Sequence, residues 1–562
     1  MKRVIALGKK YYHIVVLLGV FLVLGIFCPP VLYLNDDITM RSILSGAYTG
    51  SPDGHAVYMQ YPLTAFLAVL YRICPIVSWL ELFFMVCIWG SMLLLAKEFR
   101  SKVSGIVFAV AFCFPLYIYM HYTVVAALVA GTAVFLSCRG KHPVGGVLLL
   151  WIAYMIRSQV GLLSLPFVAA ALVWRALNRQ EHRRAQLLWI GKYVGVLAIG
   201  LGIISGINAF CYSSKDWQEY LAYNEARTQL YDYTDYTSTD RYAQNYAAYG
   251  LTQEQSNILF HYYLMLDHTI DRETIQGLAD TITEGMWSDM GAGAVAKNCL
   301  EKYYYQVRFR DFPYNIVWVA AYVLLFLGMI MQKKWWQTGF LVTLGAGRSL
   351  VWLYLIWKGR YPERVVLSLY IIELLLLLAI GIQLVQCWKE KMVTDGEKAR
   401  LGWKRSFLGK LVTIGFIVVC LCFGTYQGKN TWQETQACVK LQQGWMPLKE
   451  YCQANPEKNF FVDVFSTTTY ADIDYSADFS NMMMIGGWLS GSPLAKGRME
   501  QFGGKDAAEV LYYNEDARLV ADISQDMTWL EEYLQDRFGD CELVVSNVIY
   551  CDWRAIMEYE VR

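Results

Sequence analysis

The sequence is poor in charge and lacks the motifs of several large enzyme classes. Of its 562 residues only 17% are charged, whereas 56% are hydrophobic. It contains neither a P-loop nor the glycine-rich turn that holds a dinucleotide, so no nucleotide site is predicted. It also shows no internal repeat. Many transporter folds are built from repeats, so their absence counts against a transporter or lipid flippase.

Metal-ligand spacing is absent as well. The 14 cysteines and seven histidines are scattered along the chain without the short paired intervals of zinc ligands, so no zinc site is predicted. Cys541 and Cys551 flank a predicted hairpin, where they either pair or remain free thiols. The basic residues are spread over short loops and form no basic domain, so a nucleic-acid partner is not expected.

Long apolar runs are what the sequence has in abundance. They recur from Tyr11 to Ala209 and from Tyr314 to Thr425, and their length is that of membrane-spanning helices. We predict eleven spans: 11–34, 76–96, 103–119, 122–137, 143–157, 160–177, 187–209, 314–331, 337–357, 365–387 and 410–425. The sequence therefore predicts a polytopic α-helical membrane protein.

The loops between these spans predict its orientation. Alternate loops are rich in Lys and Arg, which the positive-inside rule places in the cytoplasm together with the N-terminus. An odd number of spans then places the C-terminus outside. Two acidic segments fall on the same outer side, 211–313 with a net charge of −7 and 426–562 with −11, whereas the remaining residues carry +19. We expect a multi-pass protein of the cell membrane.

These patterns predict a domain organisation. Residues 1–425 form the transmembrane module, which includes a first outer loop with an interfacial helix (35–75) and a large outer loop (211–313). Residues 426–562 form a small extracytoplasmic α/β domain. Its strands are predicted at 460–465, 518–522, 543–548 and 555–561, and its helices at 506–513 and 526–537.

Two groups of residues are candidates for chemistry at the outer side. Asp36 and Asp37 follow the first span. A carboxylate held at the membrane edge is partly desolvated, so its pKa rises and it can act as a general base. The alternative is that Asn35 or Asp36 caps the next helix (ITMRSIL) and that the pair only marks the membrane edge.

The second group is cationic and predicts a phosphate pocket, because arginine and lysine at the membrane edge bind phosphate well. For Arg348 alone, an ion pair with Glu373 inside the bundle fits equally well. The group consists of Arg157, Arg348, Lys358, Arg360 and Arg364.

At these residues the chain resembles the GT-C class of integral-membrane glycosyltransferases, which includes the protein O-mannosyltransferases and the lipid A aminoarabinose transferase. Those enzymes carry an acidic residue or pair directly after the first span, where this chain has Asn35-Asp-Asp37. Leu148–Pro166 (LLLWIAYMIRSQVGLLSLP) is similar to their internal span with an Arg-rich turn, and Gly359-Arg-Tyr-Pro-Glu-Arg364 is similar to their late Arg/Tyr-Arg turn. The segment Gly486–Pro493 resembles one seen in uncharacterised Gram-positive relatives.

The resemblance implies a hexosyltransferase that moves a sugar from a polyprenyl-phosphate donor to an extracytoplasmic acceptor, a cell-surface glycan or a protein. Asp36 or Asp37 would be the base, the cationic group would hold the donor phosphate, and one base without a separate nucleophile predicts inversion. Asn35, Gln159 and Tyr361 are expected substrate contacts. A divalent cation between the aspartates is allowed by the resemblance. A lipid-linked polysaccharide polymerase or ligase, which would use loop 211–313, and a lipid or glycan transporter are the alternatives.

Overall fold

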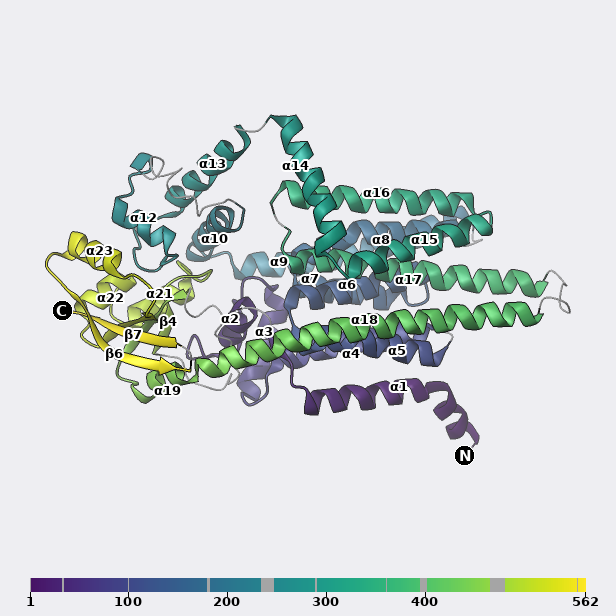
Figure 1. The fold of residues 1–562 in the computed structure, drawn as a ribbon, viewed down its shortest axis with the longest axis horizontal. Helices are drawn as coiled ribbons and strands as arrows, with labels where there is room; N and C mark the ends of the chain where they lie inside the picture. Colours follow the sequence, from purple (N-terminus) through teal and green to yellow (C-terminus); the bar gives the residue numbers. More distant parts are fainter. Residues whose placement is uncertain are drawn as a thin grey trace.

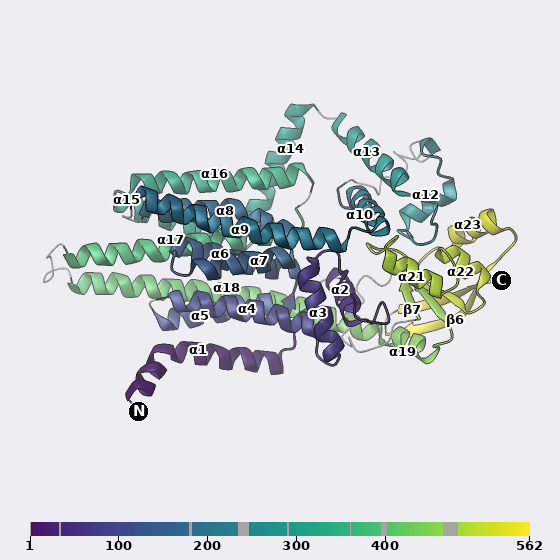
Figure 2. The ribbon, with the colours of Figure 1, turned by 180° about the vertical axis from the view of Figure 1, so that it is seen from behind.

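The computed structural model describes residues 2–32, 35–99, 101–178, 182–233, 247–288, 291–359, 361–394, 402–464, 481–552 and 554–562. Figures 1 and 2 show an elongated molecule with two parts. A bundle of long helices forms one part, and a small mixed domain at the end far from the N-terminus forms the other. We call the end of the bundle that carries this domain the domain end.

Seven helices in the described part of the chain are long and apolar enough to cross a membrane. Most of them expose large apolar side chains, such as Ile199 on α9 and Leu324 on α15, as expected for helices that face lipid. These seven are α4 (Trp79–Glu98), α6 (Tyr122–Arg139), α8 (Ser158–Asn178), α9 (Arg183–Cys211), α15 (Tyr314–Met331), α16 (Trp335–Trp357) and α17 (Glu363–Thr394).

Four further helices run along the bundle. Each coincides with one of the remaining predicted spans, so every predicted span is helical, while the count of eleven crossings stays a prediction. They are α1 (Lys2–Phe27), α5 (Lys102–Ile118), α7 (Pro143–Ile156) and α18 (Gly402–Gly444). Two predicted ends were wrong. The first helix stops at Phe27 and not at residue 34, and α18 continues without a break to Gly444 where an end at 425 was expected.

Helix α6 is the centre of the bundle. Almost all of its residues are buried, and it packs against α7, α8 and α17. Its sequence is rich in Ala and includes Gly131, where an added Cβ would come within 2.8 Å of Leu375 on α17. Small residues let helix backbones approach closely where no water is present to drive association. This close packing fixes the start of α6 at the domain end.

The segment between α1 and α4 folds back onto the start of α6. A two-residue parallel pairing joins β1 (Val31–Leu32) to β2 (Tyr119–Met120). Helix α2 (Asn35–Ser45) follows β1 directly, so its first turn lies beside His121 and Tyr122. Helix α3 (Tyr61–Ile73) is the predicted interfacial helix, with Pro62 in its first turn, where a missing N–H costs nothing.

The loop between α9 and α15 is helical where it is described. Figure 1 shows α10 and α12 beside the C-terminal domain, with α13 packed against α10. The elements are α10 (Lys215–Tyr233), α12 (Gln253–Phe260), α13 (Arg272–Ser288), α14 (Ala292–Tyr305) and the π-helical turn η1 (Gln306–Arg310).

The C-terminal part contains a five-stranded mixed sheet in the order β4-β3-β5-β7-β6. Strand β3 pairs in parallel with β4 and β5, and β5, β7 and β6 pair antiparallel, with β6 and β7 forming the predicted closing hairpin. The strands are β3 (Asn459–Val462), β4 (Met482–Met484), β5 (Ala517–Asp522), β6 (Leu543–Cys551) and β7 (Arg554–Val561). The helices are α19 (Met446–Ala454), α21 (Pro493–Gln501), α22 (Ala507–Tyr513) and α23 (Thr528–Phe538). Cys541 and Cys551 are both free thiols, so no disulfide joins them.

Candidate functional site

The two adjacent aspartates have different surroundings. Asp37 is fully buried, and its Oδ1 accepts a hydrogen bond of 3.1 Å from the backbone N–H of Tyr122. It therefore satisfies one of the unpaired amide groups at the start of α6. The capping alternative named a different helix, α2, whose first turn contains both aspartates. Asp36, one residue earlier in α2, is only partly buried. Of the two carboxylates, Asp36 is therefore the more exposed.

Arg157 lies at the end of α7, and its side chain rests on aromatic rings. Its Nη1 donates a 2.5 Å hydrogen bond to the hydroxyl of Tyr122, and its guanidinium lies 4.9 Å from the ring centre of Tyr122 and 5.2 Å from that of Tyr58. Such cation–π contacts hold a cation without neutralising it. Among the described residues, Arg157 has no carboxylate within ion-pair distance.

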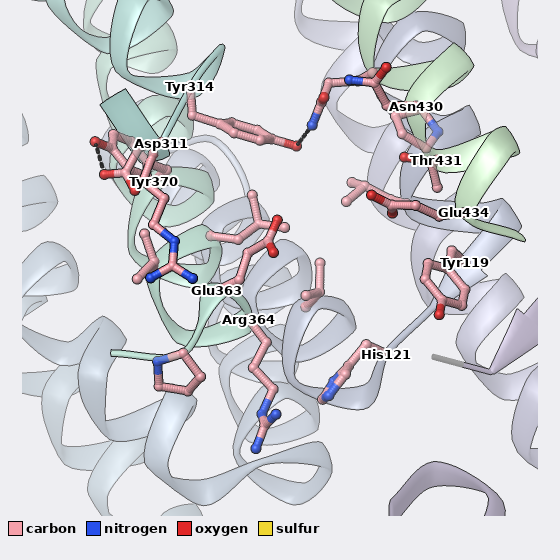
Figure 3. Close-up of a pocket in the computed structure, with 18 of the residues that line it drawn as sticks. Tyr119, His121, Asp311, Tyr314, Glu363, Arg364, Tyr370, Asn430, Thr431 and Glu434 are labelled. Atoms are coloured by element: carbon pink, nitrogen blue, oxygen red, sulfur yellow. Dashed lines mark hydrogen bonds between the residues drawn. The ribbon is translucent and has the colours of Figure 1, made fainter. Parts of the chain in front are cut away.

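Arg364 completes the charged group from the first turn of α17. It is partly buried and lines a cavity of about 740 Å³ together with His121 and Tyr361. Figure 3 shows the side chains of Arg364 and His121 at one edge of this cavity. Like Arg157, Arg364 forms no ion pair with any carboxylate in the described part of the chain. Two cations without paired carboxylates are suited to bind an anion.

A third arginine comes from the large loop, and no pattern in the sequence indicated it. Arg227 on α10 is buried, and its guanidinium donates to the hydroxyl of Tyr262 at 2.5 Å and to Oδ1 of Asn224 at 2.9 Å. It lies within electrostatic reach of Asp36. No apolar pattern marks α10, and only the tertiary fold brings it to the first outer loop.

These charges set the proton affinity of Asp36. Burial raises the pKa of its carboxyl above the ordinary value, and the positive charges of Arg364, Arg157 and Arg227 partly offset that rise. The charge of Asp232 acts in the same direction as burial. A carboxylate with a raised pKa that is still surrounded by cations is the arrangement expected of a general base.

His121 is neutral at this site. Burial lowers its pKa well below the ordinary value, and Arg364 and Arg157 lower it further. Its Nδ1 accepts a 2.9 Å hydrogen bond from the backbone N–H of Thr123, which places the ring proton on Nε2. His121 can therefore donate a hydrogen bond, but it adds no charge to the anion site.

The C-terminal domain covers this group of residues through the segment 486–493. The ring of Trp488 lies 4.8 Å from that of Tyr58, and the carbonyl oxygen of Trp488 accepts a 2.7 Å hydrogen bond from the hydroxyl of Tyr220. A Cβ at Gly486 would overlap the carbonyl oxygen of Tyr262, so only glycine fits there. The segment that the sequence analysis singled out thus joins the C-terminal domain to the segment between α1 and α4 and to the large loop between α9 and α15.

The remaining predicted site residues make none of the contacts given above, or they lie outside the residues that the structure describes. Arg348 is fully buried in the bundle and forms an ion pair of 3.1 Å with Glu373, which is the alternative that the sequence left open for it. Lys358 is exposed against Trp357, and Gln159 is exposed at the start of α8. Arg360 and the side chain of Asn35 lie outside the described residues.

At the aspartate pair, where the resemblance allows a divalent cation, one oxygen of Asp37 is used by the backbone N–H of Tyr122. Within the described residues, one group of three ligand-type side chains is close enough to share an ion: Asp267, His268 and Asp506. There, however, the Oδ2 atom of Asp506 already lies 2.9 Å from Nη2 of Arg537 and 2.6 Å from Nδ1 of His268. We interpret this group as an ion-pair network that joins the large loop to the C-terminal domain.

No protein-family model matches the chain, and comparisons with curated proteins and with solved structures give no match. The assignment of a function therefore rests on the site itself.

Proposed function

We propose that the protein is a membrane glycosyltransferase of the GT-C type that transfers a sugar from a polyprenyl-phosphate donor to an extracytoplasmic acceptor. One observation carries the proposal. Asp36 lies at the end of an apolar bundle beside Arg157 and Arg364, two cations without carboxylate partners in the described chain. A lipid phosphate is an anion that reaches such a position from within the membrane.

The proposed reaction is a single displacement at the anomeric carbon. An acceptor hydroxyl attacks that carbon, its proton passes to a carboxylate oxygen of Asp36, and the bond from carbon to the phosphate oxygen breaks. The polyprenyl phosphate leaves with the bonding electrons, and Arg157 and Arg364 stabilise the charge that develops on it. One displacement inverts the configuration at carbon. Arg227 lies further along the same charged group and lowers the pKa of Asp36 together with them.

The orientation belongs to the same proposal. The N-terminus and the basic loops would be cytoplasmic, and the domain end with its acidic segments would be extracytoplasmic, with eleven crossings between them. The arrangement supports this, because the N-terminus and the C-terminal domain lie at opposite ends of the bundle (Figure 1). The donor then enters from the outer leaflet of the cell membrane.

The test uses the purified full-length protein in lipid nanodiscs with a panel of labelled polyprenyl-phosphate hexoses. We expect release of sugar to water or its transfer to added glycan, with the opposite anomeric configuration in the product. Retained configuration, or no turnover with any donor and no phosphate-dependent donor binding, contradicts the proposal.

A polymerase or ligase of lipid-linked polysaccharides is the second candidate, and one observation favours it. Arg227, a residue of the large loop, is buried in the same charged group. In that case Arg227→Gln would abolish turnover while Asp36→Asn would leave it intact. The transferase predicts the reverse order of severity, because Asp36 takes the proton and Arg227 only adjusts its pKa.

A further inference from the structure

The cavity beside Asp36 has one wall that the proposed chemistry does not use. Helix α18 continues past the bundle, and the residues Gln427, Asn430, Thr431 and Glu434 line the cavity from it. Their spacing places them on one face of the helix. Figure 3 shows Asn430, Thr431 and Glu434 on one side of the cavity and Glu363 on the facing side, with the two carboxylates directed toward each other.

Several hydrogen-bond donors and acceptors on this wall form no hydrogen bond within the described residues. The side chains of Asn430 and Thr431 make no hydrogen bond to any residue that the structure describes, although both are partly buried. Gln427 uses one N–H, which it donates to the hydroxyl of Tyr314 at 3.0 Å. Amide, hydroxyl and carboxylate groups beside tyrosine rings are suited to bind several hydroxyl groups at once.

The charge of the cavity differs between its two ends. Arg364 stands at the end near Asp36, whereas Glu363 and Glu434 face each other near α18. A second cation, Arg310, also lines the cavity and precedes Asp311 in the chain. Burial raises the pKa of Glu434, and the negative charge of Glu363 raises it further. Asp311, which accepts a 2.9 Å hydrogen bond from the hydroxyl of Tyr370, adds a third carboxylate. An anionic group placed at the α18 end would meet these carboxylates at close range.

We propose that the α18 end of this cavity binds the acceptor, and that the acceptor is a hydroxyl-rich carbohydrate without negative charge, neutral or carrying an amino group. Its role as acceptor rests on the proposed transferase function. The cavity of about 740 Å³ falls within the roughly 300–1,000 Å³ usual for ligand sites. Ile38 and Arg364 line it as well, so a bound sugar lies next to the first turn of α2 that carries Asp36. The two glutamates disfavour acidic polysaccharides and phosphodiester polymers at the α18 end.

Direct binding to the full-length protein in nanodiscs tests this inference without requiring turnover. The probes are labelled trisaccharides in three classes: neutral hexoses, amino sugars and uronic acids, with oligo(glycerol phosphate) as a second anion. We expect neutral or amino-sugar probes to bind and both anions to fail. Asn430→Leu is expected to weaken binding about tenfold, on the scale of one lost hydrogen bond. Gln433→Leu, an exposed position of α18 outside the cavity lining, is the matched control and leaves binding unchanged.

Two variants separate this inference from the transferase proposal. Asp36→Asn is expected to lose turnover but to keep carbohydrate binding. Loss of activity alone is therefore no evidence against the acceptor site. The double variant Glu363→Gln with Glu434→Gln is expected to improve binding of uronic acids by about tenfold relative to neutral sugars, because it removes two repelling charges. The inference is overturned if acidic probes bind wild type as well as neutral ones, if no probe binds, or if Asn430→Leu weakens binding of polyprenyl phosphate instead of carbohydrate.

Discussion

Arg348 and Arg157 are both shielded from solvent, yet they are held in opposite ways. Arg348 lies between α16 and α17 with its Nε 3.1 Å from Oε2 of Glu373, which also accepts hydrogen bonds from Nε1 of Trp318 and the hydroxyl of Tyr322. Within the described residues, the contacts given for the guanidinium of Arg157 are to the rings of two tyrosines and the hydroxyl of one of them. The charge of Arg348 is neutralised by Glu373, whereas the charge of Arg157 is not neutralised by the tyrosines and can act on a bound anion. Pairing, and not burial alone, therefore distinguishes a structural charge from one available to a substrate.

Breaking the neutralised pair gives the largest expected effect on stability. Arg348→Met leaves Glu373 as an uncompensated charge inside the bundle, and we expect a loss of about 3–5 kcal/mol. The double variant with Glu373→Met removes both charges and is expected to recover most of that loss. Thermal unfolding in detergent measures both. Equal destabilisation by the single and double variants would show that the pair does not hold the bundle together.

Removing Arg364, a cation without an ion pair in the described residues, tests whether such a charge serves a substrate. Arg364→Gln is expected to lower kcat by about 10²–10³, as loss of one charge-stabilising donor does, with little change in unfolding temperature. It also changes the pH dependence. Asp36 works as a base only when ionised, so activity falls as pH drops through its pKa. Arg364 is the largest influence that lowers this pKa, so the acid limb of the pH–rate profile moves to higher pH in the variant. An unchanged or lower limb contradicts the assignment of Asp36 as the base.

Part of this structure could be predicted from the sequence. Its apolar runs predicted where the helices lie, and the position of Asp36 after the first span predicted the acidic half of the site. It also left the Arg348–Glu373 pair open as an alternative. Arg227 and Tyr58 were missed, because they reach the site through the packing of loops that carry no periodic pattern. The wall of the cavity was missed for a related reason. Residues beyond Thr425 turn polar, which resembles the end of a span, whereas α18 stays helical as it leaves the apolar bundle.

The smallest effect is expected where the C-terminal domain covers the site. Gly486→Ala forces a Cβ against the carbonyl oxygen of Tyr262, and we expect it to cost about 1–3 kcal/mol, as overpacking does. Limited proteolysis of the C-terminal domain should become faster at the same time. Gly497→Ala is the matched control, because an added Cβ there meets open space on α21. Equal proteolysis of the two variants would mean that the domain is not held through this segment.

The adjacent aspartates give the most direct test of the central claim, that Asp36 is the base and Asp37 a helix cap. Asp36→Asn and Asp37→Asn are compared with wild type by single-turnover transfer from the polyprenyl-phosphate hexose that wild type uses. Asp36→Asn is expected to lose about 10²–10⁴ in rate, the usual worth of a general base, with its unfolding temperature preserved. Asp37→Asn keeps an oxygen that accepts the N–H of Tyr122 and is expected to stay within about tenfold of wild type. Equal loss in both variants, or a greater loss in Asp37→Asn, would contradict the account.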